Sequence, residues 1–236
     1  MKVDADMKRL IIGCGTGRCG SVSLAKFLSA QSSISVLHEG VISDRGIHHL
    51  IPWYESEKQL LAWLTELQKI SGDNKWCGDV GPYFLPYLPT IFKRYPTSRA
   101  ICLERNRREV ITSYLKKTEG RNHWYRHKGV GWVEDPEWDA SFPWYEEPEK
   151  ASALGLYWDQ YHCMSLEYCA RFHDQFLLVP MAALNTVDGE RKILEFLEYD
   201  QDAAVVGHFH ANASYENRLK RSLTRLSSMF EMNNRP

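Results

Sequence analysis

The chain has 236 residues, of which 29 are basic and 30 acidic, giving a formal net charge of -1. This balance excludes a global basic field that would attract nucleic acid or an anionic membrane, so any anion site must be local. No window approaches the roughly 18 apolar residues that cross a bilayer, and the first residues lack an apolar segment. We therefore expect a cytoplasmic protein without nucleic-acid or membrane partners.

Short apolar runs alternate with helical patterns along the whole chain. Strands are predicted over 9–14, 34–38, 76–80, 99–104 and 176–179, and helices over 21–30, 57–70, 83–94, 107–117 and 151–173. Such alternation predicts a single α/β domain over 1–236, with a parallel β-sheet flanked by helices. Ligands of these sheets bind at the carboxyl ends of the strands.

The first predicted strand runs into a glycine-rich turn, LIIGCGTGRCGSVSL. Gly15 and Gly20 have the spacing of a phosphate-binding loop, but Ser21 and Val22 replace the lysine and the Mg²⁺-binding hydroxyl that nucleoside triphosphatases place there. Backbone amides of such a turn bind an anion, and Arg18 adds a positive charge. The predicted cradle consists of Gly15, Thr16, Gly17, Arg18, Cys19, Gly20, Ser21, Val22 and Ser23.

The six cysteines form no C-x-x-C pair, so reduced thiols are expected. Cys14 and Cys102 lie in apolar runs and are interpreted as small buried hydrophobes. Cys19 precedes a predicted helix, where a thiolate could be stabilised, but a packing role is favoured for it too.

A second anion site is predicted after the fourth strand, in RAICLERNRREVITSYLKK. Arg105 follows the strand directly, and Ser113 comes eight residues later, about two turns along the next helix. Together they could hold one further phosphate. The alternative is that the arginines of this run are solvated beside Glu104 and Glu109.

These two motifs, in this order, resemble those of the sulfotransferases that use 3′-phosphoadenosine 5′-phosphosulfate (PAPS). The resemblance covers 9–114 and, more loosely, 179–197, and the layout is similar to tyrosylprotein, Golgi-type and bacterial members. It implies that Arg18 contacts the leaving phosphate or the sulfuryl group, and that Arg105 and Ser113 bind the 3′-phosphate. A late basic loop with Arg218, Lys220 and Arg221 would also contact the 3′-phosphate, or these residues would form the polar face of a terminal helix.

Two departures from the family pattern are visible in the motifs. Many members have two threonines where this chain has Ser21 and Val22, so one hydroxyl contact is absent unless Ser23 replaces it. Arg107 stands where a proline is often found in the second motif.

The second strand ends in VLHEG, which supplies two candidates for the general base of a transfer to a hydroxyl. Side chains alternate along a strand, so His38 and Glu39 are expected on opposite faces. The resemblance favours Glu39 as the base, with His38 as second candidate. Asp79, at the end of the third strand, is interpreted as the cap of the helix near Tyr83 rather than as a group that positions substrate.

The segment 119–150 breaks the pattern of strands and helices, since it combines prolines, tryptophans and charges without a period. We interpret it as a lid that binds the acceptor, because several tryptophans would be costly to leave in water. Its aromatic rings and carboxylates suit a cationic or polyhydroxyl small molecule. The candidate acceptor-binding residues are Trp124, Trp132, Glu134, Trp138 and Trp144.

The resemblance therefore implies a metal-independent sulfotransferase that moves the sulfuryl group of PAPS in line to a hydroxyl or amine, releasing adenosine 3′,5′-bisphosphate (PAP). The histidine pairs at 48–49 and 208–210 lack the companions of a zinc site. A phosphate-loop kinase or other nucleotide-binding protein, and a non-catalytic ligand-binding module, are the alternatives.

Overall fold

The computed structural model describes residues 8–41, 49–119 and 138–207. A five-stranded sheet forms its centre, with all neighbouring strands parallel and the order β2-β3-β1-β4-β5. The strands are β1 (Arg9–Gly15), β2 (Ile34–His38), β3 (Trp76–Val80), β4 (Arg99–Glu104) and β5 (Phe176–Pro180). All five strands predicted from the sequence are confirmed, and so is the parallel sheet.

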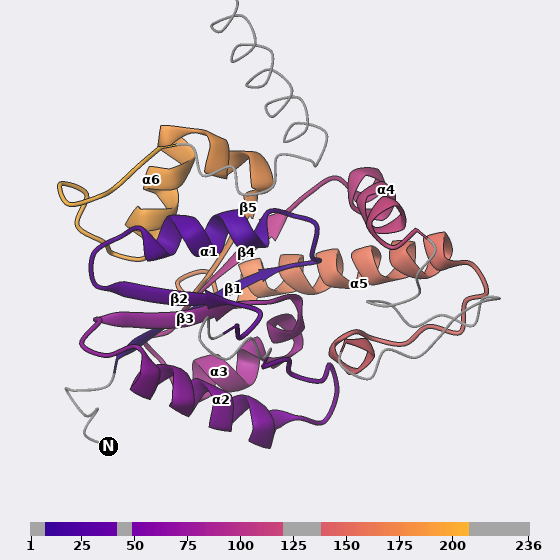
Figure 1. Ribbon diagram of the computed structural model, residues 1–236, viewed down its shortest axis with the longest axis horizontal. Coiled ribbons are helices and arrows are strands. Elements are labelled where there is room, and N and C mark those ends of the chain that lie inside the picture. Colours follow the sequence, from indigo (N-terminus) through magenta and orange to yellow (C-terminus); the bar gives the residue numbers. More distant parts are fainter. Residues whose placement is uncertain (1–7, 42–48, 120–137, 208–236) are drawn as a thin grey trace, which may run out of the picture.

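Helices cover both faces of the sheet (Figure 1). They are α1 (Ser21–Ser29), α2 (Glu57–Ile70), α3 (Leu88–Arg94), α4 (Arg107–Lys117), α5 (Lys150–Arg171) and α6 (Val187–Phe196). One hydrophobic cluster holds α1 and α6 against one face, and a larger cluster holds α2, α3 and α5 against the other. In β1 the side chains alternate between them, since Leu10 and Ile12 join the larger cluster and Ile11 the smaller.

The predicted helix over 83–94 is replaced by two shorter elements. A 3₁₀ helix, η1 (Pro82–Tyr87), comes first, and α3 follows it directly. Pro86 and Pro89 have no backbone N–H to donate, so a continuous α-helix across this stretch would be interrupted. Two further 3₁₀ turns are η2 (Asp139–Ser141) and η3 (Met181–Asn185).

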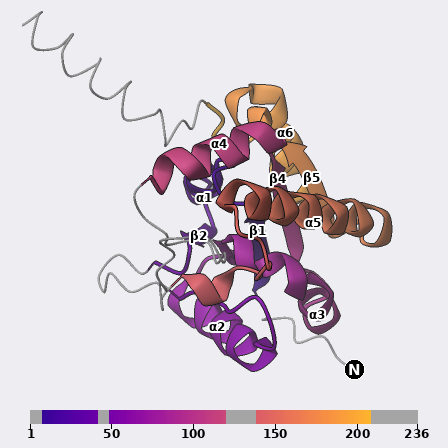
Figure 2. The ribbon, with the colours of Figure 1, turned by 90° about the vertical axis from the view of Figure 1, so that its right-hand side faces the viewer.

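The carboxyl ends of the strands lie on the side of the molecule shown in Figure 2. There α4 lies beside α5, and the loop after β1 turns back to begin α1. This arrangement brings the two motifs singled out in the sequence to one edge of the sheet. None of the helices described is long and apolar enough to cross a membrane.

Candidate functional site

A cavity of about 430 Å³ opens at the carboxyl edge of the sheet. Segments that follow all five strands contribute to its wall, as do α4 and the part of the insertion before α5. The lining residues are Gly17, Arg18, Gly20, Ser21, Val22, Ser23, His38, Glu39, Pro82, Arg105, Tyr114, Lys117, Trp138, Phe142, Met181, Leu184 and Asn185. Its volume lies within the range of small-molecule sites.

The loop after β1 has the geometry of an anion cradle. Gly20 precedes α1 with φ of 95°, and no side-chain cap is bonded to the first amides of the helix. Residues 20–23, which carry these amides, line the cavity. Gly17 has φ of 78°, and a Cβ there would overlap the hydroxyl of Tyr114. Arg18 also has positive φ, 56°. The loop is thus held in a conformation that few sequences allow.

Two buried tyrosines hold this loop from beneath. The hydroxyl of Tyr114, from α4, donates to the carbonyl of Thr16 at 2.6 Å. The hydroxyl of Tyr161, from α5, accepts from the amide of Gly15 at 2.8 Å and donates to the carbonyl of Pro82 at 3.1 Å. The sequence reasoning missed both roles, because nothing in their spacing distinguishes these tyrosines from ordinary core residues.

The two predicted anion motifs meet at Arg18. Its Nε donates to Ser113 Oγ at 3.1 Å, and its carbonyl accepts from Arg105 Nη1 at 2.8 Å. Arg105 Nε is paired with Glu109 at 2.9 Å, one turn along α4. The indole of Trp158 donates to the carbonyl of Arg105 at 3.0 Å. Both arginines line the cavity. Ser113 is not among the lining residues, and its hydroxyl is hydrogen-bonded to Arg18.

His38 and Glu39 both line the cavity, contrary to the expectation that they lie on opposite faces. Glu39 has left-handed backbone geometry, with φ of 52°, so the alternation of the strand ends at His38. As a result His38 Nδ1 lies 3.6 Å from Glu39 Oε2, and His38 Nε2 lies 2.9 Å from Ser21 Oγ. The two candidate bases are therefore neighbours.

The carboxyl of Glu39 titrates near neutrality. Its pKa is raised from 4.5 to about 7, chiefly by burial and also by the negative charge of Asp79, while the positive charge of Arg18 opposes the rise. Its side chain is 21% exposed, so the group reaches the cavity while most of it is shielded from water. A carboxyl with a pKa near 7 is suited to accept a proton at physiological pH.

Asp79 does not cap the helix after β3, so that prediction is wrong. The residue before η1 is Gly81, and no side chain caps this helix. Asp79 is instead fully buried and accepts hydrogen bonds from two backbone amides and the indole of Trp63. A buried carboxylate needs such donors, and burial still raises its pKa to about 6.

Some residues of the described part of the insertion line the cavity and others do not. Trp138 lines it, as does Phe142, which the sequence reasoning did not single out. Trp144 is 43% exposed and is not among the lining residues. Trp124, Trp132 and Glu134, like the basic residues Arg218, Lys220 and Arg221, lie outside the described residues.

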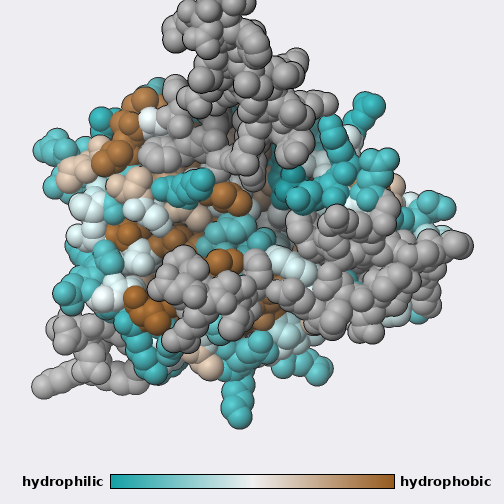
Figure 3. All heavy atoms as spheres, viewed as in Figure 1, coloured by the Kyte–Doolittle hydropathy of each residue, from teal (hydrophilic) through white to brown (hydrophobic). Residues whose placement is uncertain are grey.

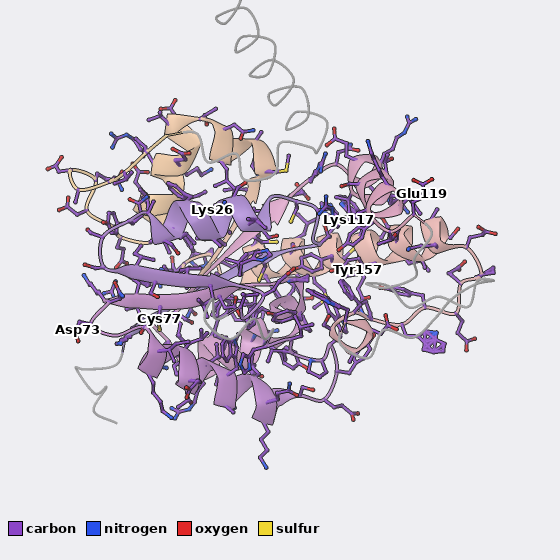
Figure 4. The ribbon with its side chains drawn as sticks, viewed as in Figure 1. Lys26, Asp73, Cys77, Lys117, Glu119 and Tyr157 are labelled. Atoms are coloured by element: carbon purple, nitrogen blue, oxygen red, sulfur yellow. The ribbon has the colours of Figure 1, made fainter. Side chains whose placement is uncertain are left out.

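Other lining residues were also missed. Tyr114 and Lys117 both lie on α4, directly after Ser113 and four residues after it. Residues four apart lie on the same face of a helix, so the position of Ser113 could have indicated Lys117. Figure 4 shows Lys117 at the end of α4, on the side of the loop before α1. Met181, Leu184 and Asn185 come from η3, after β5.

The thiol of Cys19 is fully buried, and burial raises its pKa to about 11. The packing role is thus supported over a reactive thiolate. Cys14 and Cys102 are buried as well. Within the described ranges, no group of three or more histidine, cysteine or acidic side chains has the arrangement of a metal site.

No family model and no curated protein sequence matches the chain. Among solved structures, a sulfotransferase from Alicyclobacillus acidocaldarius aligns with 92% of this chain and 90% of its own, with a TM-score of 0.51 and 15% identity. Mouse sulfotransferase SULT7A1, complexed with PAP, aligns with 97% of this chain and 68% of its own, with a TM-score of 0.48 and 15% identity. The fold assignment rests on the bacterial structure. The chain therefore has the sulfotransferase fold, with its cavity at the carboxyl ends of the strands.

Proposed function

We propose that the protein is a PAPS-dependent sulfotransferase that moves a sulfuryl group to a hydroxyl or amine of a small molecule. One observation carries the proposal: a single cavity joins an amide cradle, two arginines and a carboxyl whose pKa is about 7. The amide cradle would bind the donor, and the arginines would stabilise the negative charge that develops during transfer. The carboxyl would remove the proton of the acceptor.

The donor's anionic groups match the positive side of the cavity. PAPS carries charge at its 3′-phosphate and at its 5′-phosphosulfate. We assign the 5′ end to the amides of residues 17–23 and to Arg18, and the 3′-phosphate to the second motif, where Arg105 lines the cavity and Ser113 is hydrogen-bonded to Arg18. We assign contact with the adenosine to Met181 and Leu184 of η3, apolar residues that line the cavity.

The transfer moves one sulfuryl group from an oxygen of the donor to an oxygen or nitrogen of the acceptor. The bond between sulfur and the bridging oxygen of the phosphosulfate breaks while a bond from the acceptor oxygen or nitrogen to sulfur forms in line with it. The acceptor's proton goes to Glu39, and the bridging oxygen leaves on PAP with increased negative charge. Arg18 and the loop amides would stabilise that oxygen, as preorganised donors do where charge develops.

The proposal differs from a kinase mechanism at two residues. Ser21 cannot supply the positive charge of the phosphate-loop lysine, and Val22 has no hydroxyl to offer to Mg²⁺. The positive charge comes instead from Arg18, within the loop. We therefore include metal independence in the proposal.

We assign the acceptor to Glu39 and His38 and to three further residues that line the same cavity, Pro82, Trp138 and Phe142. Aromatic faces bind sugar rings and cationic groups well. A cationic or polyhydroxyl small molecule thus remains our proposal for its class.

Calorimetry with PAP and with Mg·ATP tests the donor. We expect PAP to bind in the presence of EDTA and Mg·ATP to bind at least tenfold more weakly. Consumption of PAPS with pooled metabolites then tests the reaction. Preference for Mg·ATP would indicate a kinase, and PAP binding without turnover on any pool would favour a non-catalytic binding module.

A further inference from the structure

The turn after β2 depends on a residue of the neighbouring strand. Glu39 and Gly40 both have positive φ, 52° and 63°. The amide of Glu39 donates to the carbonyl of Val80 at 2.9 Å, and the amide of Gly40 donates to Asp79 Oδ1 at 3.1 Å. A Cβ on Gly40 would lie 2.6 Å from the Cβ of His49. The end of β3 therefore holds both residues of the turn.

Asp79 is itself fixed on all sides. Its Oδ1 also accepts from the amide of Val80 at 2.8 Å, and its Oδ2 accepts from Trp63 Nε1 at 3.0 Å and from the hydroxyl of Tyr83 at 3.4 Å. Its relative exposure is 0%, so it does not touch a ligand in the cavity. Burying a carboxylate costs free energy unless its hydrogen bonds are satisfied, and a fully satisfied network is rigid. We therefore consider what this rigid group fixes in place.

We infer that Asp79 is a positioning residue for Glu39: it fixes the turn through the amide of Gly40 and places a negative charge beside the carboxyl that is to accept the proton. The inference rests on the proposed function, since it gives Glu39 the role of base. It replaces the capping role that the sequence suggested for Asp79.

The charge effect has a definite direction. Groups that act on Glu39 are His38 on β2, Arg18 in the loop, Asp79 on β3, Tyr83 on η1 and Tyr114 on α4. Among them Asp79 supplies a second negative charge, which makes ionisation of Glu39 less favourable. Without that charge the pKa of Glu39 would fall. Glu39 would then be a weaker base, even if the geometry of the turn were unchanged.

Two substitutions of Asp79 separate position from charge. Asp79→Asn can keep the contact of Oδ1 with the amide of Gly40 but removes the charge, whereas Asp79→Ala removes both. With PAPS and an acceptor found by screening, we expect Asp79→Ala to lower kcat at least about thirtyfold. Asp79→Asn should lower kcat less and move the acid limb of the pH profile to lower pH, because the second negative charge is removed. The affinity for PAP should change less than threefold in either variant.

Ile91→Val is the matched control, because Ile91 is buried in the cluster that contains Tyr83 and has no part in this network. Its acid limb should coincide with that of the parent protein. Equal losses of kcat in both Asp79 variants with no movement of the limb would overturn the inference. Losses that appear in PAP affinity rather than in kcat would overturn it too.

A measurement on the unaltered protein avoids dependence on folding of the variants and on turnover. With ¹³C-labelled carboxyl groups, the resonances of Glu39 and Asp79 should each titrate in two steps, because the charge of each affects the other. A single independent step for Glu39 would contradict the inference. Absence of sulfuryl transfer together with two-step titration would instead reject the proposed function and leave the coupling established.

Discussion

Replacing Glu39 by glutamine should stabilise the protein in neutral and alkaline solution. The folded protein holds this carboxyl at a pKa of about 7, whereas 4.5 is its ordinary value. Between these pH values the unfolded chain loses the proton and the folded chain keeps it. Stability contributed by the raised pKa is complete below pH 4.5 and is lost as pH rises through 7.

The magnitude follows from the shift. At about 1.4 kcal/mol per pKa unit, a rise from 4.5 to about 7 corresponds to about 3 kcal/mol of lost stability above pH 7. Glutamine has nearly the same shape and no charge, so Glu39→Gln avoids this loss. For a domain of this size, about 2–4 °C per kcal/mol gives an increase in Tm of about 6–12 °C.

Thermal unfolding of Glu39→Gln and the parent protein, measured from pH 4.5 to 8, tests this expectation. The two Tm values should coincide near pH 4.5, diverge through pH 7 and stay apart above it. Glu119→Gln, at an exposed position after α4, is the control and should show no such divergence. A difference in Tm that is independent of pH, or a less stable Glu39→Gln at pH 8, would refute the reasoning.

The same substitution should slow the proposed reaction severely. General bases contribute about 10²- to 10⁴-fold to a rate, so PAPS turnover by Glu39→Gln should fall by that factor while PAP binding is kept. In the parent protein, turnover should decrease as pH falls below about 7, since protonated Glu39 cannot accept a proton. Turnover that is constant from pH 5 to 8 would contradict the role of Glu39.

Three further predictions concern the donor side. Arg18→Ala should lower kcat by about a hundredfold or more, because Arg18 would act on the leaving oxygen; equal kcat in steady-state assays would exclude that role. Lys117→Met should weaken PAP binding about threefold in calorimetry, because one cation leaves the cavity wall. Lys116 is not among the lining residues, so Lys116→Met should leave the affinity unchanged. Equal effects of the two substitutions would contradict the prediction. Tyr114→Phe removes the bond to the carbonyl of Thr16 and should lower both Tm, by scanning calorimetry, and PAP affinity; an unchanged affinity would separate this tyrosine from the loop.

The sheet and its anion loop were predictable from the sequence because both depend on local patterns. Apolar runs of five or six residues between helical stretches indicate parallel strands, and the strand bounds in the structure differ from the predicted ones by at most one residue. The order β2-β3-β1-β4-β5 places the two anion motifs side by side. This neighbourhood was expected from the rule that ligands gather at the carboxyl ends of strands.

The errors arose where backbone conformation or distant contacts override a local pattern. Positive φ at Glu39 breaks the alternation that predicted opposite faces. Asp79 resembles a helix cap in sequence, but its donors come from α2 and from the turn after β2. Figure 3 shows hydrophilic side chains over α4, as expected from the charged residues in its sequence, whereas no local pattern indicates the contacts of Glu39 and Asp79.

The hydroxyl of Tyr161 joins two parts of the cavity wall that serve different molecules. It accepts from Gly15 in the loop assigned to the donor and donates to Pro82 on the side assigned to the acceptor. A displacement of either segment changes the geometry of both bonds, because one oxygen makes them. A shift of the donor loop on binding would therefore act through this one hydroxyl on the segment beside the acceptor, so we expect the affinity for each substrate to change when the other is bound.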